Sequence, residues 1–156
     1  MEKKKIIVSA CLLGVKCRFD GLGKENKSIL DLKEKYDFIP VCPEILGGLP
    51  TPRVSSEIKL GKVINKEGID VTDNYMRGAL ETLKICKVFD VNTAVLKSKS
   101  PSCGKGKVYD GTFSGSLVDG NGITTQLLID NGINVYTEDE FIEKYYWRYI
   151  INMIFI

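Results

Sequence analysis

Short apolar runs alternate along the chain with longer segments of helical periodicity. The apolar runs are rich in β-branched residues and predict four buried strands, at positions 5–10, 35–42, 92–97 and 133–137. Helices are predicted between them at about 28–35, 73–89 and 123–130. A last helix is expected after Thr137, where "TEDE" forms the start of a capping box.

This alternation predicts a parallel sheet with helices on its faces, in a compact Rossmann-like α/β fold. Two segments interrupt the pattern and are expected to form hairpins or irregular excursions, at 57–70 ("EIKLGKVINKEGID") and 107–115 ("KVYDGTFSG"). With 156 residues, of which 44% are hydrophobic, the chain is long and apolar enough to bury one core. We therefore expect a single domain over residues 1–156.

The net charge and the N-terminal residues limit the kinds of partner and the compartment that are expected. A formal charge of +2 is too small to indicate a nucleic-acid binder. The lysines at the N-terminus precede a strand-like run without a small-residue cleavage site, so no secretory signal is recognised and a cytoplasmic protein is expected. The apolar tail at about 145–156, "YYWRYIINMIFI", is too short to span a bilayer. It predicts a packed or interface helix, compatible with a homodimer.

The chain has five cysteines and no histidine. In a reducing compartment, cysteines are better candidates for metal ligands, nucleophiles or core residues than for disulfides. The missing histidine excludes a Ser-His-Asp triad, a Cys-His pair and zinc sites with imidazole ligands. The chemistry must therefore use thiolate, carboxylate, hydroxyl or lysine side chains, or a cofactor.

Three cysteines follow predicted strands: Cys11 the first, Cys42 the second and Cys103 the third. The carboxyl ends of parallel strands form the ligand-binding crevice of an open sheet, so these thiols are expected to converge. Lysines at 97, 99, 105 and 107 surround Cys103, and ammonium groups lower thiol pKa values. The alternatives are three small buried hydrophobic residues at strand ends and a solvated lysine-rich loop.

The other two cysteines differ from these three. Cys86 falls in helical register with Met76, Ala79, Leu80 and Leu83 and is predicted to lie in the core. Cys17 lies in the loop "KCRFDG", where it is equally well explained as a fourth ligand or as an idle thiol.

Two metal centres suit three thiolates. Zinc takes three cysteines plus a carboxylate or water, but its structural sites usually show closely paired cysteines, which this chain lacks. An iron–sulfur cluster needs only convergent thiolates, and three of them on a [4Fe–4S] cube leave one iron open to a substrate. An open iron implies Lewis-acid chemistry.

Five segments in order, "VSACLLG", "CRFDG", "PVCPEILGGLPTPR", "LKSKSPSCG" and "YDGTFSG", resemble the signature blocks of a bacterial family long of unknown function, some of whose members are thiouracil desulfidases. The blocks run from Val8 to about Gly115. The resemblance implies a [4Fe–4S] cluster held by three cysteines that map onto Cys11, Cys42 and Cys103. It also implies removal of sulfur from a small thiocarbonyl substrate, such as a thiolated pyrimidine, without redox change and with release of sulfide.

Such a reaction needs a general base to activate water. Glu44, two residues after Cys42, is the nearest candidate, with Asp20 next. Ser100 is expected to act in catalysis, and Ser102 and Arg53 to bind substrate. The alternatives are a surface glutamate, serines that cap the loop, and a surface salt bridge between Arg53 and Glu44.

Two other functions remain open. A cluster- or zinc-binding sensor or structural module needs neither an open metal position nor a pocket. A thiol-based transferase with Cys103 as nucleophile predicts activity that survives metal removal. Nucleotide binding is disfavoured, since no Walker A loop or complete dinucleotide fingerprint is present.

Overall fold

A computed structural model describes residues 2–155. Its central sheet has the strand order β2-β1-β5-β8, and every neighbouring pair is parallel. These are the four predicted strands, at β1 (Lys4–Ser9), β2 (Tyr36–Val41), β5 (Thr93–Leu96) and β8 (Asn134–Thr137). The predicted α/β class with a mostly parallel sheet is confirmed.

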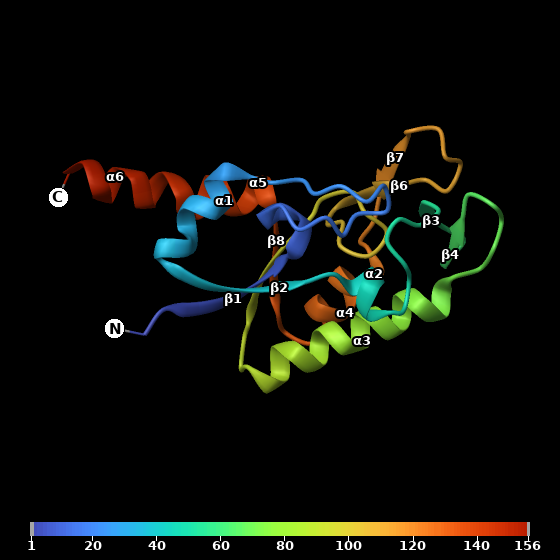
Figure 1. Cartoon of the computed structure of the whole chain (residues 1–156), viewed down its shortest axis with the longest axis horizontal. Coiled ribbons are helices and arrows are strands. Elements are labelled where there is room, and N and C mark those ends of the chain that lie inside the picture. Colours follow the sequence, from blue (N-terminus) through green and yellow to red (C-terminus); the bar gives the residue numbers. More distant parts are fainter. Residues whose placement is uncertain (1, 156) are drawn as a thin grey trace.

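Helices cover both faces of this sheet (Figure 1). Side chains alternate along β1, so Ile6 and Val8 point to one face and Ile7 to the other. The Ile7 side packs against α3 (Thr72–Val88) and α4 (Ile123–Asp130). The opposite side packs against α1 (Lys27–Asp31), which continues as a 3₁₀ turn (Leu32–Glu34), and α5 (Glu138–Phe141). All of these helices begin within one residue of the expected positions, and Thr137 forms the predicted capping box with Glu140.

The face that α3 buries differs from the prediction. Cys86, Ala79 and Leu83 are buried as expected, but Met76 and Leu80 are 40% and 53% exposed. The buried stripe instead includes Tyr75, Gly78 and Thr82. The reason is the short helix α2 (Pro43–Leu46), which packs against α3 at Gly78 and covers that side of the helix.

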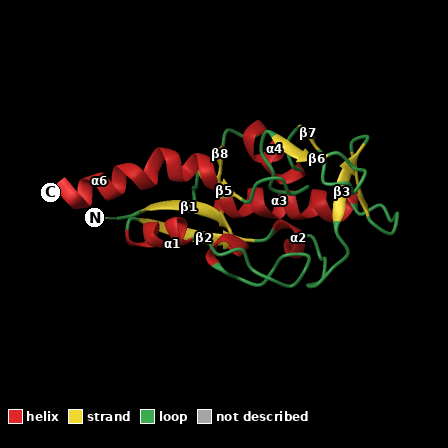
Figure 2. Ribbon diagram, turned by 90° about the horizontal axis from the view of Figure 1, so that it is seen from above, coloured by secondary structure: helices red, strands yellow, loops and turns green. Residues whose placement is uncertain are grey.

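Both interruptions of the alternation are antiparallel hairpins. The first is β3 (Ser56–Lys59) with β4 (Lys62–Asn65), and the second is β6 (Lys107–Tyr109) with β7 (Leu117–Asp119). They lie together at the end of the molecule opposite the C-terminal helix (Figure 2). The predicted excursions are therefore confirmed.

The C-terminal segment passes through one π-helical turn (Ile142–Tyr146) into α6 (Trp147–Phe155). Tyr145, Tyr146 and Tyr149 pack against the core, whereas the side chains from Ile151 to Phe155 are exposed. The helix projects beyond the sheet (Figure 1). Within residues 2–155, no helix is long and apolar enough to cross a membrane. The predicted domain ends, residues 1 and 156, lie outside the described residues.

Candidate metal centre

The carboxyl ends of β1, β2 and β5 open onto a pocket of about 620 Å³. The strand β2 is added on one side of β1, and β5 is added later on its other side. The order in which strands are added therefore reverses between β1 and β5. Ligands of open α/β sheets bind at such a switch point. The pocket is lined by all seven side chains that the sequence predicted for the site: Cys11, Cys42, Glu44, Arg53, Ser100, Ser102 and Cys103. Asp20, the second candidate base, does not line it.

Three thiols reach this pocket from three strand ends. Cys11 lies in the 3₁₀ turn that follows β1, and Cys42 begins α2 directly after β2. Cys103 lies in the turn after β5. Cys11 and Cys103 are 7% and 4% exposed, and Cys42 is half-buried. The expected convergence is therefore present in the structure.

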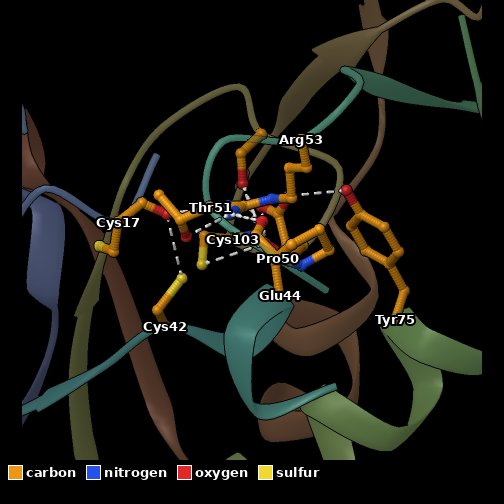
Figure 3. A network of polar contacts seen from close by, with 10 residues as sticks. Cys17, Cys42, Glu44, Pro50, Thr51, Arg53, Tyr75 and Cys103 are labelled. Carbon is orange, nitrogen blue, oxygen red and sulfur yellow. Dashed lines mark hydrogen bonds and ion pairs between the residues drawn. The ribbon is translucent and has the colours of Figure 1, made fainter. Parts of the chain in front are cut away.

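Cys17 joins these thiols, whereas Cys86 does not. The Cys17 side chain lines the same pocket as Cys11 and Cys42, and the Cys42 thiol lies 3.7 Å from the Cys17 carbonyl oxygen (Figure 3). Cys86 is buried between α3 and the sheet, outside the pocket lining. The site thus holds four sulfur atoms.

The expectation that nearby lysines lower the pKa of Cys103 is wrong. Burial raises the pKa of this thiol to about 12. Contact with the Cys17 thiol, followed by burial, raises the pKa of Cys42 well above its usual range. Two of these lysines form ion pairs with glutamates instead. Lys97 pairs with Glu138 at 3.6 Å, and Lys105 pairs with Glu140 at 3.0 Å. Metal binding must therefore displace protons from the thiols.

Glu44 is the centre of a buried hydrogen-bond network (Figure 3). Its Oε1 accepts from Tyr75 Oη at 2.7 Å and from Arg53 Nε at 3.1 Å, and its Oε2 accepts from Ser102 Oγ at 3.1 Å. The side chains of Arg53 and Glu44 are only 5% and 14% exposed. The surface glutamate and the surface salt bridge, considered as alternatives, are excluded by this burial.

Arg53 connects the carboxylate to the cysteine loop. Its Nη2 donates to the carbonyl oxygen of Cys17 at 3.0 Å, and its Nη1 donates to Pro50 and Thr51 oxygens at 3.1 and 3.2 Å. Every nitrogen of the guanidinium therefore contacts the protein itself. This geometry favours a positioning role for Arg53 over the predicted contact with substrate.

The two serines differ in what they contact. Ser100 Oγ accepts from the backbone nitrogen of Cys103 at 2.7 Å and fixes the turn. Ser102 is 1% exposed, and its Oγ lies against the Glu44 carboxylate and 3.5 Å from the Cys103 sulfur. The geometry therefore favours Ser102 over Ser100 for the role nearer the chemistry.

Sequence reasoning missed two residues of the site. Tyr75 lies one helical turn before Ala79, so the helical register of Cys86 and Ala79 contained the signal for it. Burial and the Glu44 charge raise the pKa of Tyr75, which keeps it a hydrogen-bond donor. Ser9 ends β1, accepts from the Lys97 backbone nitrogen at 2.8 Å and lines the same pocket as Cys103.

The donor set fits an iron–sulfur cluster. Thiolates are the usual protein ligands of such clusters, and Cys11, Cys42 and Cys103 line one enclosed space. In the part of the chain that the structure describes, no three cysteine or carboxylate side chains come close enough together to hold a single ion.

Comparisons with known proteins agree with this donor set. The model of a family described as 2-thiouracil desulfurase matches residues 6–140. Protein YbbK of Bacillus subtilis (strain 168), described as uncharacterized, is 40% identical over 145 residues, which cover 86% of this chain and 96% of YbbK. The solved structure of the [4Fe-4S]-dependent thiouracil desulfidase TudS superposes with a TM-score of 0.85 at 43% identity, covering 90% of this chain and 95% of TudS. The chain belongs to the 2-thiouracil desulfurase family.

Proposed function

We propose that the protein is a [4Fe–4S]-dependent desulfidase that hydrolyses a thiocarbonyl of a small thiolated substrate, such as a thiolated pyrimidine, and releases sulfide. The observation that carries the proposal is the buried carboxylate of Glu44 in the same pocket as three convergent thiols. The likeness to TudS supports the choice of cofactor and substrate class.

Cys11, Cys42 and Cys103 would hold the cluster. A cluster with three protein ligands supplies one iron that acts as a Lewis acid toward the sulfur of the substrate. The overall reaction exchanges the sulfur of the thiocarbonyl for the oxygen of water and forms hydrogen sulfide. No electrons are gained or lost, so no external reductant is needed.

Glu44 would be the general base that takes a proton from the attacking water. Tyr75 and Arg53 both contact its Oε1, which fixes the plane of the carboxylate. Ser102 contacts Oε2 and Cys103, so it links the base to the metal side of the pocket. Ser102 would also pass a proton between Glu44 and the departing sulfur. A single base of this kind contributes about 100-fold or more to the rate.

The pocket lining includes aromatic side chains that suit a flat ring. They belong to Phe19, Tyr109 and Phe113. Aromatic faces stack on planar heterocycles. The substrate would lie beside these rings and the thiols.

The test is sulfide release by protein reconstituted with iron and sulfide under anaerobic conditions, with 2-thiouracil or 4-thiouracil and no reductant. Glu44→Gln should keep its iron and lose at least about 100-fold in rate. Glu67→Gln, an exposed carboxylate change on the first hairpin, is the matched control and should keep full activity. A requirement for a reductant would rule out the hydrolytic mechanism, and full activity in Glu44→Gln would move the base elsewhere.

A cluster-binding sensor is the second candidate. The buried Glu44 network beside the thiols favours the enzyme, because a sensor has no use for an oriented base. If protein with a full cluster released no sulfide from any thioamide, the sensor would become the preferred function.

A further inference from the structure

Cys17 is the fourth sulfur of the pocket, and the proposed mechanism does not use it. Its side chain is 4% exposed and lines the same space as the three predicted ligands. It reaches that space from a loop, whereas Cys11, Cys42 and Cys103 follow strands. Figure 3 shows Cys17, Cys42 and Cys103 on three separate segments that border the site.

The loop that carries Cys17 is closed tightly at its base. Gly14 has φ +93°, a conformation that favours glycine, and its nitrogen donates to the Cys11 carbonyl at 3.0 Å. The Lys24 nitrogen donates to the same carbonyl at 2.8 Å. A Cβ at Gly23 would lie 2.6 Å from the Gly14 oxygen, so the two glycines allow the ends of the loop to touch. The loop therefore leaves Cys11 and returns to it.

Further contacts hold the Cys17 backbone beside the predicted site. Arg53 donates to the Cys17 carbonyl at 3.0 Å while it pairs with Glu44. The Cys42 thiol lies 3.7 Å from the same carbonyl. The backbone of Cys17 is thus held in position by residues that also form the predicted site.

We propose that Cys17 is a fourth, exchangeable thiolate ligand of the cluster, bound at the iron left free by Cys11, Cys42 and Cys103 until a thione substrate replaces it. The inference rests on the proposed function. The exchange is a ligand substitution without electron transfer: the bond from iron to the Cys17 sulfur breaks, and the released thiolate takes a proton from water. Its loop position makes Cys17 the ligand that can move without disturbing a strand.

The experiment compares anaerobically reconstituted wild type with Cys17→Ser and Cys17→Ala, using Lys16→Ser as an exposed control on the same loop. Cyanide, a small ligand for an open iron, is titrated against the reduced cluster and followed by electron paramagnetic resonance. Because a bound thiolate must first leave, both Cys17 variants should bind cyanide about tenfold more tightly than wild type or Lys16→Ser. They should also lose iron to mild oxidation about tenfold faster.

The outcomes separate the inference from the proposed function. If wild type and Cys17→Ser, both with a full cluster, bind cyanide equally tightly, the proposal for Cys17 is wrong and the proposed function still stands. A wild type that never binds cyanide, together with variants that hold no iron, also overturns it, because Cys17 would then be a permanent ligand. A wild type that forms no cluster at all counts against the proposed function itself.

Discussion

At the scale of single residues, the site combines buried thiols with a buried carboxylate. The thiols are easier to keep neutral than charged in this setting, since burial raises the pKa of Cys103 to about 12. A bound cluster would reverse that preference, because metal ligation deprotonates thiols. Before a metal binds, the thiols are therefore neutral, and packing and hydrogen bonds keep them in position.

The first prediction concerns the three ligands. Cys11→Ser, Cys42→Ser and Cys103→Ser should each lose most of the iron, because a hydroxyl is a poor ligand for an iron–sulfur cluster. Iron and acid-labile sulfide per chain, measured after anaerobic reconstitution, check this. Cys86→Ser is the control: it should keep its iron and lose about 1–3 kcal/mol of unfolding free energy through its buried hydroxyl. Full iron in Cys11→Ser would show that the ligand set is wrong.

The second prediction uses the pKa of Cys86, which burial raises from 9.0 to about 11. The folded state holds this proton more tightly than the unfolded state, so its contribution is complete below pH 9 and is lost as the pH rises to 11. Urea unfolding of apo-protein at both ends of this window gives the loss. In Cys86→Ala the loss should be smaller by about 2 kcal/mol. Equal losses in both proteins would contradict the assignment.

The candidate site was predictable from the sequence where strand ends determine it. Cys11, Cys42 and Cys103 follow strands, and Glu44 follows Cys42, so their convergence was expected from the parallel sheet. The roles of Ser100 and Ser102 were not predictable in this way. Both lie in one irregular turn, and no period tells which hydroxyl faces a carboxylate that is distant in sequence.

At the scale of elements, two crossings hold the site in place. In the first, α2 lies against α3, where a Cβ at Gly78 would lie 1.8 Å from the Pro43 carbonyl oxygen. Glu44 belongs to α2 and Tyr75 to α3, so this close approach sets the distance between them. In the second, Glu57 of β3 accepts from the nitrogens of Gly111 and Phe113 at 3.0 and 3.1 Å and joins the two hairpins.

The third prediction addresses the first crossing. Gly78→Ala should push α2 away from α3, lower the unfolding free energy by about 1–3 kcal/mol and reduce turnover while iron is retained. Lys84→Ala, at an exposed position of the same helix, should change neither quantity appreciably. Denaturant unfolding and sulfide release measure the two effects. Unchanged turnover in a folded Gly78→Ala would mean that the helix spacing does not position the base.

The fourth prediction addresses the second crossing. Glu57→Ala leaves the Gly111 and Phe113 nitrogens without their acceptor. The loop that brings the Phe113 ring to the pocket should therefore become more mobile. The KM for the thiolated substrate should rise more than kcat falls, because the reacting groups remain in place. Steady-state kinetics distinguish the two parameters. A fall in kcat alone would assign Glu57 to the chemistry instead.

Elements with strong periodicity were predictable to within one or two residues, as the capping box at Thr137 illustrates. The error on α3 has a tertiary cause. Met76 and Leu80 satisfied the helical period as well as Tyr75 did, but the glycine that admits α2 decides which side of the helix is covered. The hydrophobic pattern of one helix does not show which other helix packs against it.

At the scale of the whole molecule, the two hairpins and the C-terminal helix lie at opposite ends (Figure 1). The hairpins border the pocket, whereas α6 carries exposed Trp147, Ile151, Met153, Ile154 and Phe155 beyond the sheet. The predicted homodimer stays a prediction, with this helix as the surface on which to test it.

The fifth prediction is that removal of residues 151–156 leaves iron content and sulfide release unchanged. The side chains of residues 151–155 are exposed and do not line the pocket, so the loss of unfolding free energy should be below about 1 kcal/mol. Sedimentation of both proteins over a range of concentrations tests association at the same time. Loss of activity together with loss of a dimer would show that the site depends on the partner copy.

The order in which the chain is synthesised gives the strand-end arrangement a further consequence. β1 and β2 leave the ribosome first and carry Cys11 and Cys42, but Cys103 waits until β5 and its turn have emerged. β5 must also pair beside β1 before the three sulfurs share one space. A partly made chain therefore offers only two of the three proposed ligands, so delivery of the proposed cluster would have to follow translation of most of the protein.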